Sequence, residues 1–302
     1  MFFKKNSNTY ISVFLSILVF FAFSISQINL ENLWFDELMT FWIANPEINN
    51  HETFKKIINY ENTPPLYYFI LKYFFKIFGY DYQLVRVPNI IFHIFSIFVF
   101  YSILIKISKD KFFVYLGMIL FSSNYFLISY AQEARVFIFF CLTSLCFINS
   151  YLIIRETGFE LKVPNLLFLF IFSLILLSSF IFSFVLIGSL FFYEFFFEKK
   201  NKKYFAINGV VFLSIIISIF FNIEFYKSIL NFEAVSISNQ TINFYIFNYF
   251  FKQFFGSKIM GYLFILFFFV SIIYLIKNRN KDKKLLFLLL IVFFSYSVPI
   301  TY

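Results

Sequence analysis

Long, uninterrupted apolar runs are the feature that most restricts how this chain can fold. The first covers residues 10–28, and others cover 84–105, 112–130 and 135–154. As a helix rising about 1.5 Å per residue, a run of about 20 residues crosses the hydrocarbon core of a bilayer. Backbone amides in hydrocarbon must be paired within a helix or a closed barrel, and these runs are continuous rather than alternating. We therefore predict an all-α polytopic membrane protein.

The remaining apolar runs complete a predicted topology of about nine transmembrane helices. Residues 204–223, 259–276 and 285–300 each form one predicted span, and residues 164–197 form a hairpin of two short spans. Lysine and arginine gather in the loops of one side only if the chain folds back in this hairpin, so the positive-inside rule favours it. The basic loops are then cytoplasmic, and we predict a multi-pass protein of the cytoplasmic (inner or plasma) membrane.

The composition agrees with lipid as the main solvent of the fold. Hydrophobic residues make up 61% of the 302 residues, and charged residues only 14%. The net charge of +9 comes from basic residues between apolar runs, so we predict no nucleic-acid partner. Cys141 and Cys146 lie five positions apart in one predicted span. They point to different faces of that helix, and we expect them to pack rather than to form a disulfide.

The first outer segment, residues 29–83, is predicted to hold the functional site. It contains two stretches suited to short interfacial helices, followed at 66–79 by an amphipathic piece that is too short to span. Lys72 and Lys76 are four positions apart and share one face of that piece. Under the predicted topology, ten of the 16 acidic residues lie on this side of the membrane, so we expect chemistry there.

An acidic pair, Asp36 and Glu37, follows Trp34 soon after the first predicted span. This position puts two carboxylates at the level of the lipid headgroups, where ionised groups are costly unless they are paired or used. The alternative is a solvated loop with ordinary acidic residues. The motifs that follow the pair favour a functional role.

Further polar groups gather on the same side. Tyr67 and Tyr68 follow a double proline that suits the start of an interfacial helix, and they are candidate substrate-binding residues. Arg86 stands at the outer end of a span, where it either binds a phosphate or extends to the headgroups. Glu133 and Arg135 lie in a short outer turn, where a local ion pair is the simpler interpretation. Together these groups suit a substrate that combines lipid, phosphate and sugar.

The order of these motifs resembles the GT-C membrane glycosyltransferases. The similarity is to the bacterial relatives of protein O-mannosyltransferases and of the transferases that add aminoarabinose to lipid A. Family members usually continue past this length, so we expect one GT-C-like domain over residues 1–302 that is either a short form or a truncated product. The motifs span about residues 30–140, and the matching segments are Trp34-Phe35-Asp36-Glu37, Thr63-Pro64-Pro65-Leu66-Tyr67-Tyr68, Phe78-Gly79, Arg86-Val87-Pro88 and Tyr130-Ala131-Gln132-Glu133-Ala134-Arg135.

The resemblance implies a reaction. The donor would be a polyprenyl-phosphate sugar, the acceptor a hydroxyl of a glycan, lipid or protein, and transfer would invert the anomeric carbon on the extracytoplasmic face. Asp36 would be the general base, with Glu37 beside it as a positioning or secondary acidic group. Some relatives use a divalent metal. The candidate metal ligands Asp36, Glu37 and Glu133 are too few to decide, so no cofactor is assigned.

The resemblance also implies which groups meet the donor phosphate. Arg86 and Arg135, together with Lys72, would offset charge on the departing lipid phosphate. Glu133 would orient one of the arginines or bind the sugar.

Two other functions stay open at this point. A transporter or flippase for lipid-linked sugars would place ionisable residues inside the spans near the midplane, and the predicted spans nearly lack them. A non-catalytic assembly subunit is the better alternative if the chain is truncated. Membrane lipids are expected contacts under every interpretation.

Overall fold

The structure is a computed structural model that describes residues 7–24, 32–61, 63–108, 110–156, 162–197 and 203–228. All regular elements in these ranges are helices, which confirms the predicted fold class in its coarse form. The chain divides into two compact units, residues 1–180 and 181–302, and the single domain over residues 1–302 stays a prediction. We describe each unit by itself.

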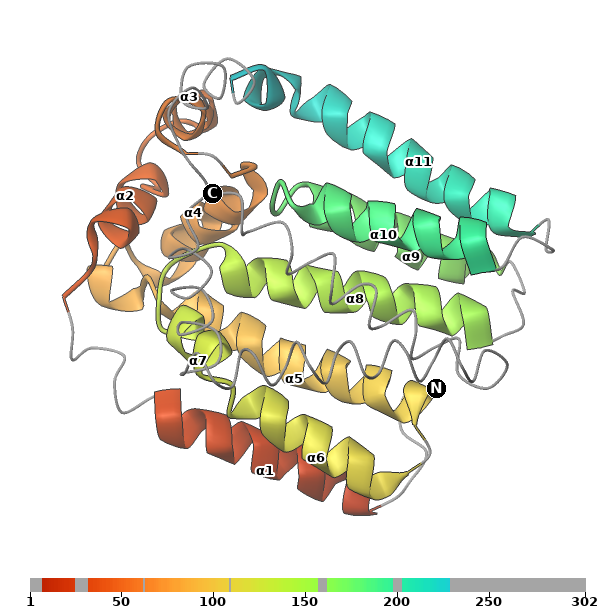
Figure 1. Cartoon of the computed structure of the whole chain (residues 1–302). Helices are drawn as coiled ribbons and strands as arrows, with labels where there is room; N and C mark the ends of the chain where they lie inside the picture. Colours follow the sequence, from red (N-terminus) through yellow and green to blue (C-terminus); the bar gives the residue numbers. More distant parts are fainter. Residues whose placement is uncertain are drawn as a thin grey trace, which may run out of the picture. The chain divides into compact units, whose positions relative to one another are not determined.

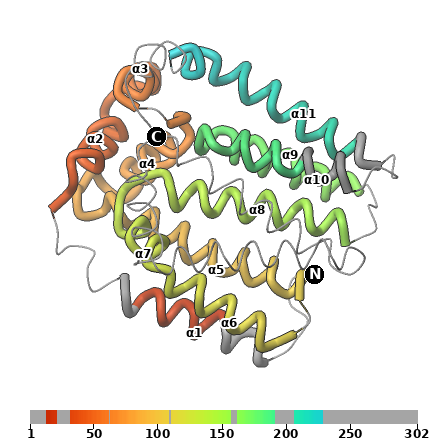
Figure 2. Tube along the Cα trace, in the orientation of Figure 1, coloured from red at the N-terminus to blue at the C-terminus, as the bar shows by residue number. Residues whose placement is uncertain are grey.

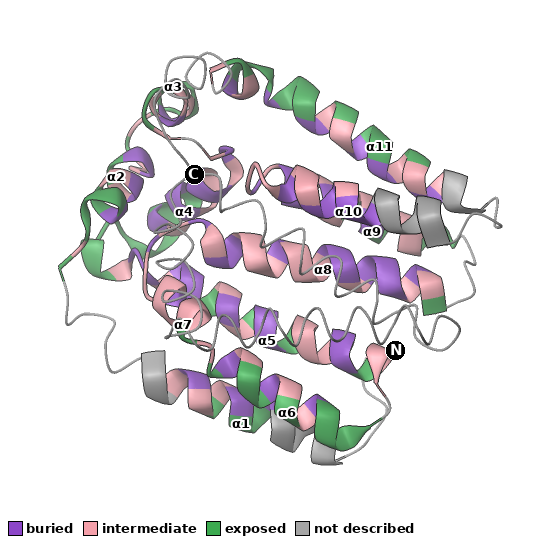
Figure 3. Ribbon diagram, in the orientation of Figure 1, coloured by how far each residue is buried: buried purple, intermediate pink, exposed green. Residues whose placement is uncertain are grey.

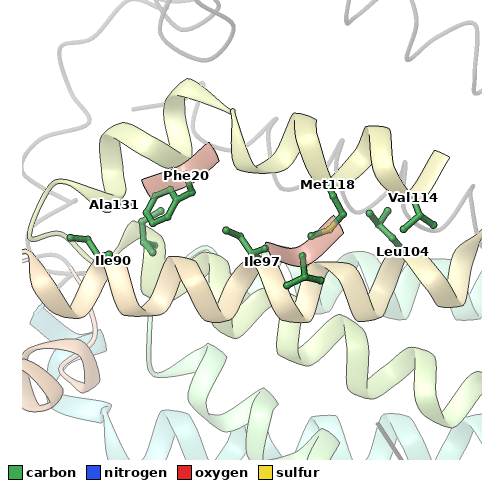
Figure 4. Close-up of a cluster of buried hydrophobic side chains, with 9 residues drawn as sticks. Phe20, Ile90, Ile97, Leu104, Val114, Met118 and Ala131 are labelled. Carbon is green, nitrogen blue, oxygen red and sulfur yellow. The ribbon is translucent and has the colours of Figure 1, made fainter. Parts of the chain in front are cut away.

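The first unit is built on long helices that run side by side (Figure 1). They are α1 (Ser7–Ser24), α5 (Val87–Ile107), α6 (Lys111–Ser122), α8 (Phe137–Glu156) and α9 (Val163–Leu177). Helix α5 packs against α8 and α6, and α1 packs against α6. Figure 4 shows the apolar cluster between α1, α5 and α6, in which Phe20, Ile97 and Met118 are buried. Burial of these side chains joins the three helices into one core.

Short helices cover one end of this unit, as the trace in Figure 2 shows. They are α2 (Phe35–Ile43), α3 (Asn50–Tyr60), α4 (Leu66–Phe78), the 3-10 turn η2 (Tyr82–Leu84) and α7 (Tyr125–Ala131). Their ends follow local rules. The side chain of Asn49 accepts a hydrogen bond from the Glu52 amide at the start of α3, and Gly79 ends α4 with φ 101°. The predicted interfacial helices are therefore present as helices.

Two helices in the described part of the chain are long and apolar enough to cross a membrane, Tyr82–Ile107 and Phe137–Glu156. The predicted single span at 112–130 is a broken helix instead, since α6 and α7 meet at 47°. The side chain of Asn124 accepts a hydrogen bond from the Leu127 amide and starts α7 as a new helix. If this bent pair is one span, the number rises to three.

The remaining predicted spans are supported only in part. The run at 164–197 consists of two helices, α9 in the first unit and α10 (Ser183–Phe197) in the second. In the second unit α10 packs against α11 (Lys203–Phe221). The predicted spans at 259–276 and 285–300 lie outside the described residues. Apolar helices compatible with a membrane protein are thus shown, and the total of nine stays a prediction.

Basic residues lie in the last turns of two long helices of the first unit. Helices α5 and α8 both begin at the end that carries α2, α3 and α4, and both run away from it (Figure 1). Lys106 and Arg155 lie in the last turns of α5 and α8, at the far end. The acidic residues of α2 lie at the near end. The near end also carries lysines, in α3 and α4, so the orientation of this unit in the membrane stays a prediction.

Candidate functional site

A buried ion pair between Glu37 and Arg86 joins α2 to the start of α5. Arg86 Nε lies 2.9 Å from Glu37 Oε1, and Nη2 lies 2.7 Å from Oε2. The side chains are only 6% and 1% exposed. The same carboxylate also accepts the backbone amides of Trp34, at 3.1 Å, and Ala134, at 2.8 Å. We call these four groups and their contacts the Glu37–Arg86 junction.

The junction explains how two buried charges are tolerated. Removing a carboxylate and a guanidinium from water is costly unless the geometry is good and the remaining hydrogen-bonding capacity is filled. Glu37 accepts two bonds on each oxygen, and Arg86 Nη2 also lies 3.4 Å from the Asn32 carbonyl oxygen. Arg86 is therefore held inside the protein rather than extended to the headgroups. Its predicted contact with a donor phosphate stays a prediction.

The second acidic residue, Asp36, points elsewhere and forms an ion pair with Arg135. Neighbouring positions on a helix are about 100° apart, so Asp36 and Glu37 cannot face the same way. The Asp36 side chain is 54% exposed and that of Arg135 is 36% exposed. Arg135 also lies over the Phe137 ring, 5.5 Å from its centroid. The predicted local pair of Arg135 with Glu133 is replaced by this long-range pair.

Asn89, one helical turn after Arg86, fixes the backbone that carries Arg135. It is fully buried, and its amide nitrogen donates to the carbonyl oxygens of Glu133 and Arg135. Its Oδ1 accepts the Tyr67 hydroxyl at 3.1 Å. Sequence reasoning missed Asn89 as a site residue, although it directly follows the Arg86-Val87-Pro88 motif.

Glu61, at the end of α3, is a further acidic group that sequence reasoning did not select. Its carboxyl hydrogen bonds with the hydroxyl of Tyr68, which also lies 3.0 Å from Thr63 Oγ1. Burial raises the pKa of Glu61, the Tyr68 bond and the Arg135 charge oppose this rise, and the Asp36 charge adds to it. The charges of Asp36 and Arg135 thus act on the pKa of Glu61 in opposite directions.

The tyrosines predicted to bind substrate are buried inside the protein. Tyr67 and Tyr68 are at most 3% exposed, and burial raises the pKa of both phenols. Glu133 is partly buried, and burial together with the nearby Glu37 charge raises its pKa. Its Oε1 lies 3.5 Å from Ser129 Oγ. All three residues belong to the same end of the unit as the junction.

Lys72 lies apart from this group. Its Nζ donates to the Ile48 carbonyl oxygen at 2.6 Å and to Thr53 Oγ1 at 2.8 Å, so it ties α4 to α3. The side chain is buried, and burial lowers the pKa of the amine. Lys76 is exposed. The two lysines thus differ in environment although they are one helical turn apart, and no described contact brings Lys72 to Asp36 or Arg135.

The candidate metal ligands are spread out. Among the described residues, no group of three or more His, Cys, Asp or Glu side chains is arranged to hold a metal ion. The oxygens of Glu37 are already occupied by four donors. Cys141 and Cys146 are free thiols. Metal dependence stays open.

The site combines a partly exposed carboxylate and guanidinium with a buried, fully bonded support. Such a pair suits proton transfer from a substrate hydroxyl next to a group that binds an anion. No protein-family model, curated protein or solved structure matches this chain. The resemblance to GT-C glycosyltransferases accordingly rests on the motifs alone and stays a prediction.

Proposed function

We propose that this protein is a membrane glycosyltransferase that moves a sugar from a polyprenyl-phosphate donor to a hydroxyl of a glycan, lipid or protein. The observation that supports this function is the ion pair between Asp36 and Arg135, two partly exposed side chains of opposite charge. They lie at the end of a bundle that contains membrane-compatible helices. A lipid-linked donor and a polar acceptor meet at such a boundary.

The chemistry requires one proton acceptor and one cation. Asp36 takes the proton of the acceptor hydroxyl, whose oxygen attacks the anomeric carbon from the side opposite the phosphate. The bond between that carbon and the phosphate oxygen breaks, and polyprenyl phosphate leaves with the electron pair. Arg135 offsets the charge that develops on the phosphate. Inversion follows from a single displacement.

The buried residues have a supporting role in this proposal. Glu37 holds α2 to the backbone of Ala134, and Asn89 holds the carbonyl of the next residue, Arg135. These bonds fix the positions from which Asp36 and Arg135 extend. Rigid support of this kind keeps reacting groups in place without ordering cost during reaction.

Transfer is placed on the extracytoplasmic face of the cytoplasmic membrane. The support is the position of Lys106 and Arg155 in the last turns of α5 and α8, at the end of the unit away from α2. A cysteine introduced as Asn45→Cys, in a variant without Cys141 and Cys146, tests this orientation. An impermeant thiol reagent added to intact cells should label it, and protection from the reagent would refute the orientation.

Reconstitution in vesicles with a polyprenyl-phosphate sugar tests the reaction directly. The expected result is release of polyprenyl phosphate by the wild type and a loss of about 10²–10⁴-fold in Asp36→Asn, the usual contribution of general base catalysis. Glu47→Gln, an exposed acidic residue just after α2, is the matched control and should retain full turnover. Equal turnover in Asp36→Asn would exclude Asp36 as the base, and no release by the wild type would refute the transferase.

A further inference from the structure

An irregular bend between α7 and α8 carries Arg135, and side chains from other elements hold its backbone. The Ala134 amide donates to the Glu37 carboxylate at 2.8 Å. The carbonyl oxygens of Glu133 and Arg135 both accept from the amide nitrogen of Asn89, the second at 2.6 Å. Because the bend has no helical hydrogen-bond ladder of its own, these contacts set the position from which the arginine side chain extends.

The Asn89 side chain can hold the bend in only one of its two orientations. A carboxamide has a donor end, the NH₂ group, and an acceptor end, the oxygen, and the two ends exchange when the group turns over. Carbonyl oxygens only accept hydrogen bonds, so the donor end must face Glu133 and Arg135. The acceptor end then points away from the bend. The hold on Arg135 therefore requires the amide to stay in this orientation.

Tyr67 of α4 binds the acceptor end of that amide. Its hydroxyl donates to Asn89 Oδ1 at 3.1 Å, and both side chains are fully buried. Without the hydroxyl, Oδ1 would be a buried acceptor that has lost its donor, which is costly. The amide could regain a donor only by turning or shifting, and either movement weakens its bonds to the bend. A buried tyrosine is suited to this indirect role more than to a direct substrate contact.

We propose that Tyr67 is a positioning residue for Arg135, which acts through the Asn89 amide and the bend. This role rests on the proposed transferase function, in which the Arg135 guanidinium offsets charge on the departing phosphate. The contacts run from the Tyr67 hydroxyl to Asn89, from Asn89 to the Arg135 carbonyl, and from the guanidinium to Asp36. A shift of the bend would move the guanidinium, and catalysis by charge stabilisation depends on groups that are already in place.

The two other tyrosines of α4 have different partners. The Tyr68 hydroxyl lies 3.0 Å from Thr63 Oγ1. The Tyr73 hydroxyl accepts from Asn50 Nδ2 at 3.2 Å. No described contact joins either hydroxyl to the bend. Tyr73→Phe therefore removes a phenol hydrogen bond from the same helix without touching this route, and it is the matched control for Tyr67→Phe.

Hydrogen–deuterium exchange of the reconstituted protein, followed by mass spectrometry, tests the route without using turnover. The amides of Ala134 and Arg135 are both hydrogen-bonded in the bend. Tyr67→Phe should speed their exchange by at least about fivefold, the equivalent of one lost hydrogen bond, and Tyr73→Phe should leave it unchanged. Amides within α8 should stay protected in both variants, which distinguishes a loosened bend from unfolding. Exchange at the wild-type rate in Tyr67→Phe would overturn the proposal.

Transfer from a polyprenyl-phosphate sugar gives the second readout. Tyr67→Phe should lower kcat by about 10–10²-fold, the effect of a small misplacement of a reacting group, and Tyr73→Phe should not. In an Arg135→Ala background the same change should have little further effect, because the residue that Tyr67 positions is absent. An equal factor in both backgrounds would show a merely structural role and overturn the proposal. No transfer by the wild type would refute the transferase, and the exchange experiment would still decide whether Tyr67 holds the bend.

Discussion

Neutralising Glu37 should destabilise the protein far more than neutralising its neighbour Asp36. In Glu37→Gln the Arg86 guanidinium, 6% exposed, is left as a buried charge without its counterion. All four contacts of the carboxylate come from N–H groups. The glutamine side chain would place its own NH₂ donor against some of these N–H donors, so those hydrogen bonds are lost. Breaking a buried pair from one side costs about 3–5 kcal/mol of the free energy of unfolding.

Two matched variants separate this cost from a general effect of mutation. Replacing both partners, as Glu37→Leu with Arg86→Met, removes both charges together and should cost less than the sum of the single variants. Asp36→Asn breaks the exposed pair with Arg135, in which the side chains are 54% and 36% exposed. Solvent screening limits that loss to about 0–1 kcal/mol.

The assay is unfolding in mixed detergent micelles, followed by tryptophan fluorescence. The chain has two tryptophans, and the Trp34 amide itself bonds to Glu37, so the probe reports on the junction. The midpoint and slope of the transition give the free energy of unfolding of each variant. If Glu37→Gln loses less than about 1 kcal/mol, the junction does not behave as a buried ion pair and the reasoning fails.

Three further substitutions test other features with the same unfolding assay. Lys72→Met keeps the aliphatic stem but removes two hydrogen bonds to the α3 region, so the free energy of unfolding should fall by about 1–3 kcal/mol. In the transfer assay, its KM for the donor should stay unchanged. A raised KM would show that Lys72 contacts the donor. His93→Leu should leave the free energy of unfolding unchanged or raise it by about 1–2 kcal/mol, because neither ring nitrogen has a hydrogen-bond partner among the described residues. A clear loss of stability would show that the imidazole is hydrogen-bonded. Gly79→Ala should lower the free energy of unfolding by about 1–2 kcal/mol. A Cβ at this position meets open space, so the cost comes from backbone strain at φ 101° alone. An unchanged free energy of unfolding would contradict that strain.

Helix positions can be predicted from this sequence where local rules set them. The predicted piece at 66–79 matches α4 (Leu66–Phe78) because a double proline and Gly79 mark its ends. The run at 112–130 shows the limit. Asn124 caps a new helix and bends the run by 47°, although every flanking stretch is apolar. Apolar continuity predicts burial in lipid or protein and does not show where a helix breaks.

The site can be predicted by region but not by role. Asp36 and Glu37 are adjacent and chemically alike, and only the packing of α5 and the segment before α8 turns one inward and leaves the other exposed. Lys72 is expected at the donor phosphate, yet its amine donates to the Ile48 carbonyl oxygen and to Thr53 of α3. Glu61 has no motif of its own, and the charges that act on its pKa come from α2 and from the segment before α8. These relations are long-range, so local patterns do not contain them.

The hydrogen bond between Glu37 and the Ala134 amide can form only after a long stretch of the chain has been synthesised. Its two residues are 97 positions apart in the chain. At about 5–20 residues per second, a ribosome needs about 5–20 s to make that stretch. Throughout that interval the Glu37 carboxylate lacks one of its final donors and relies on water, which favours keeping α2 in the aqueous phase until the segment before α8 arrives. The candidate site is therefore completed only after helices α1 to α7 have been synthesised, and before α8 and α9.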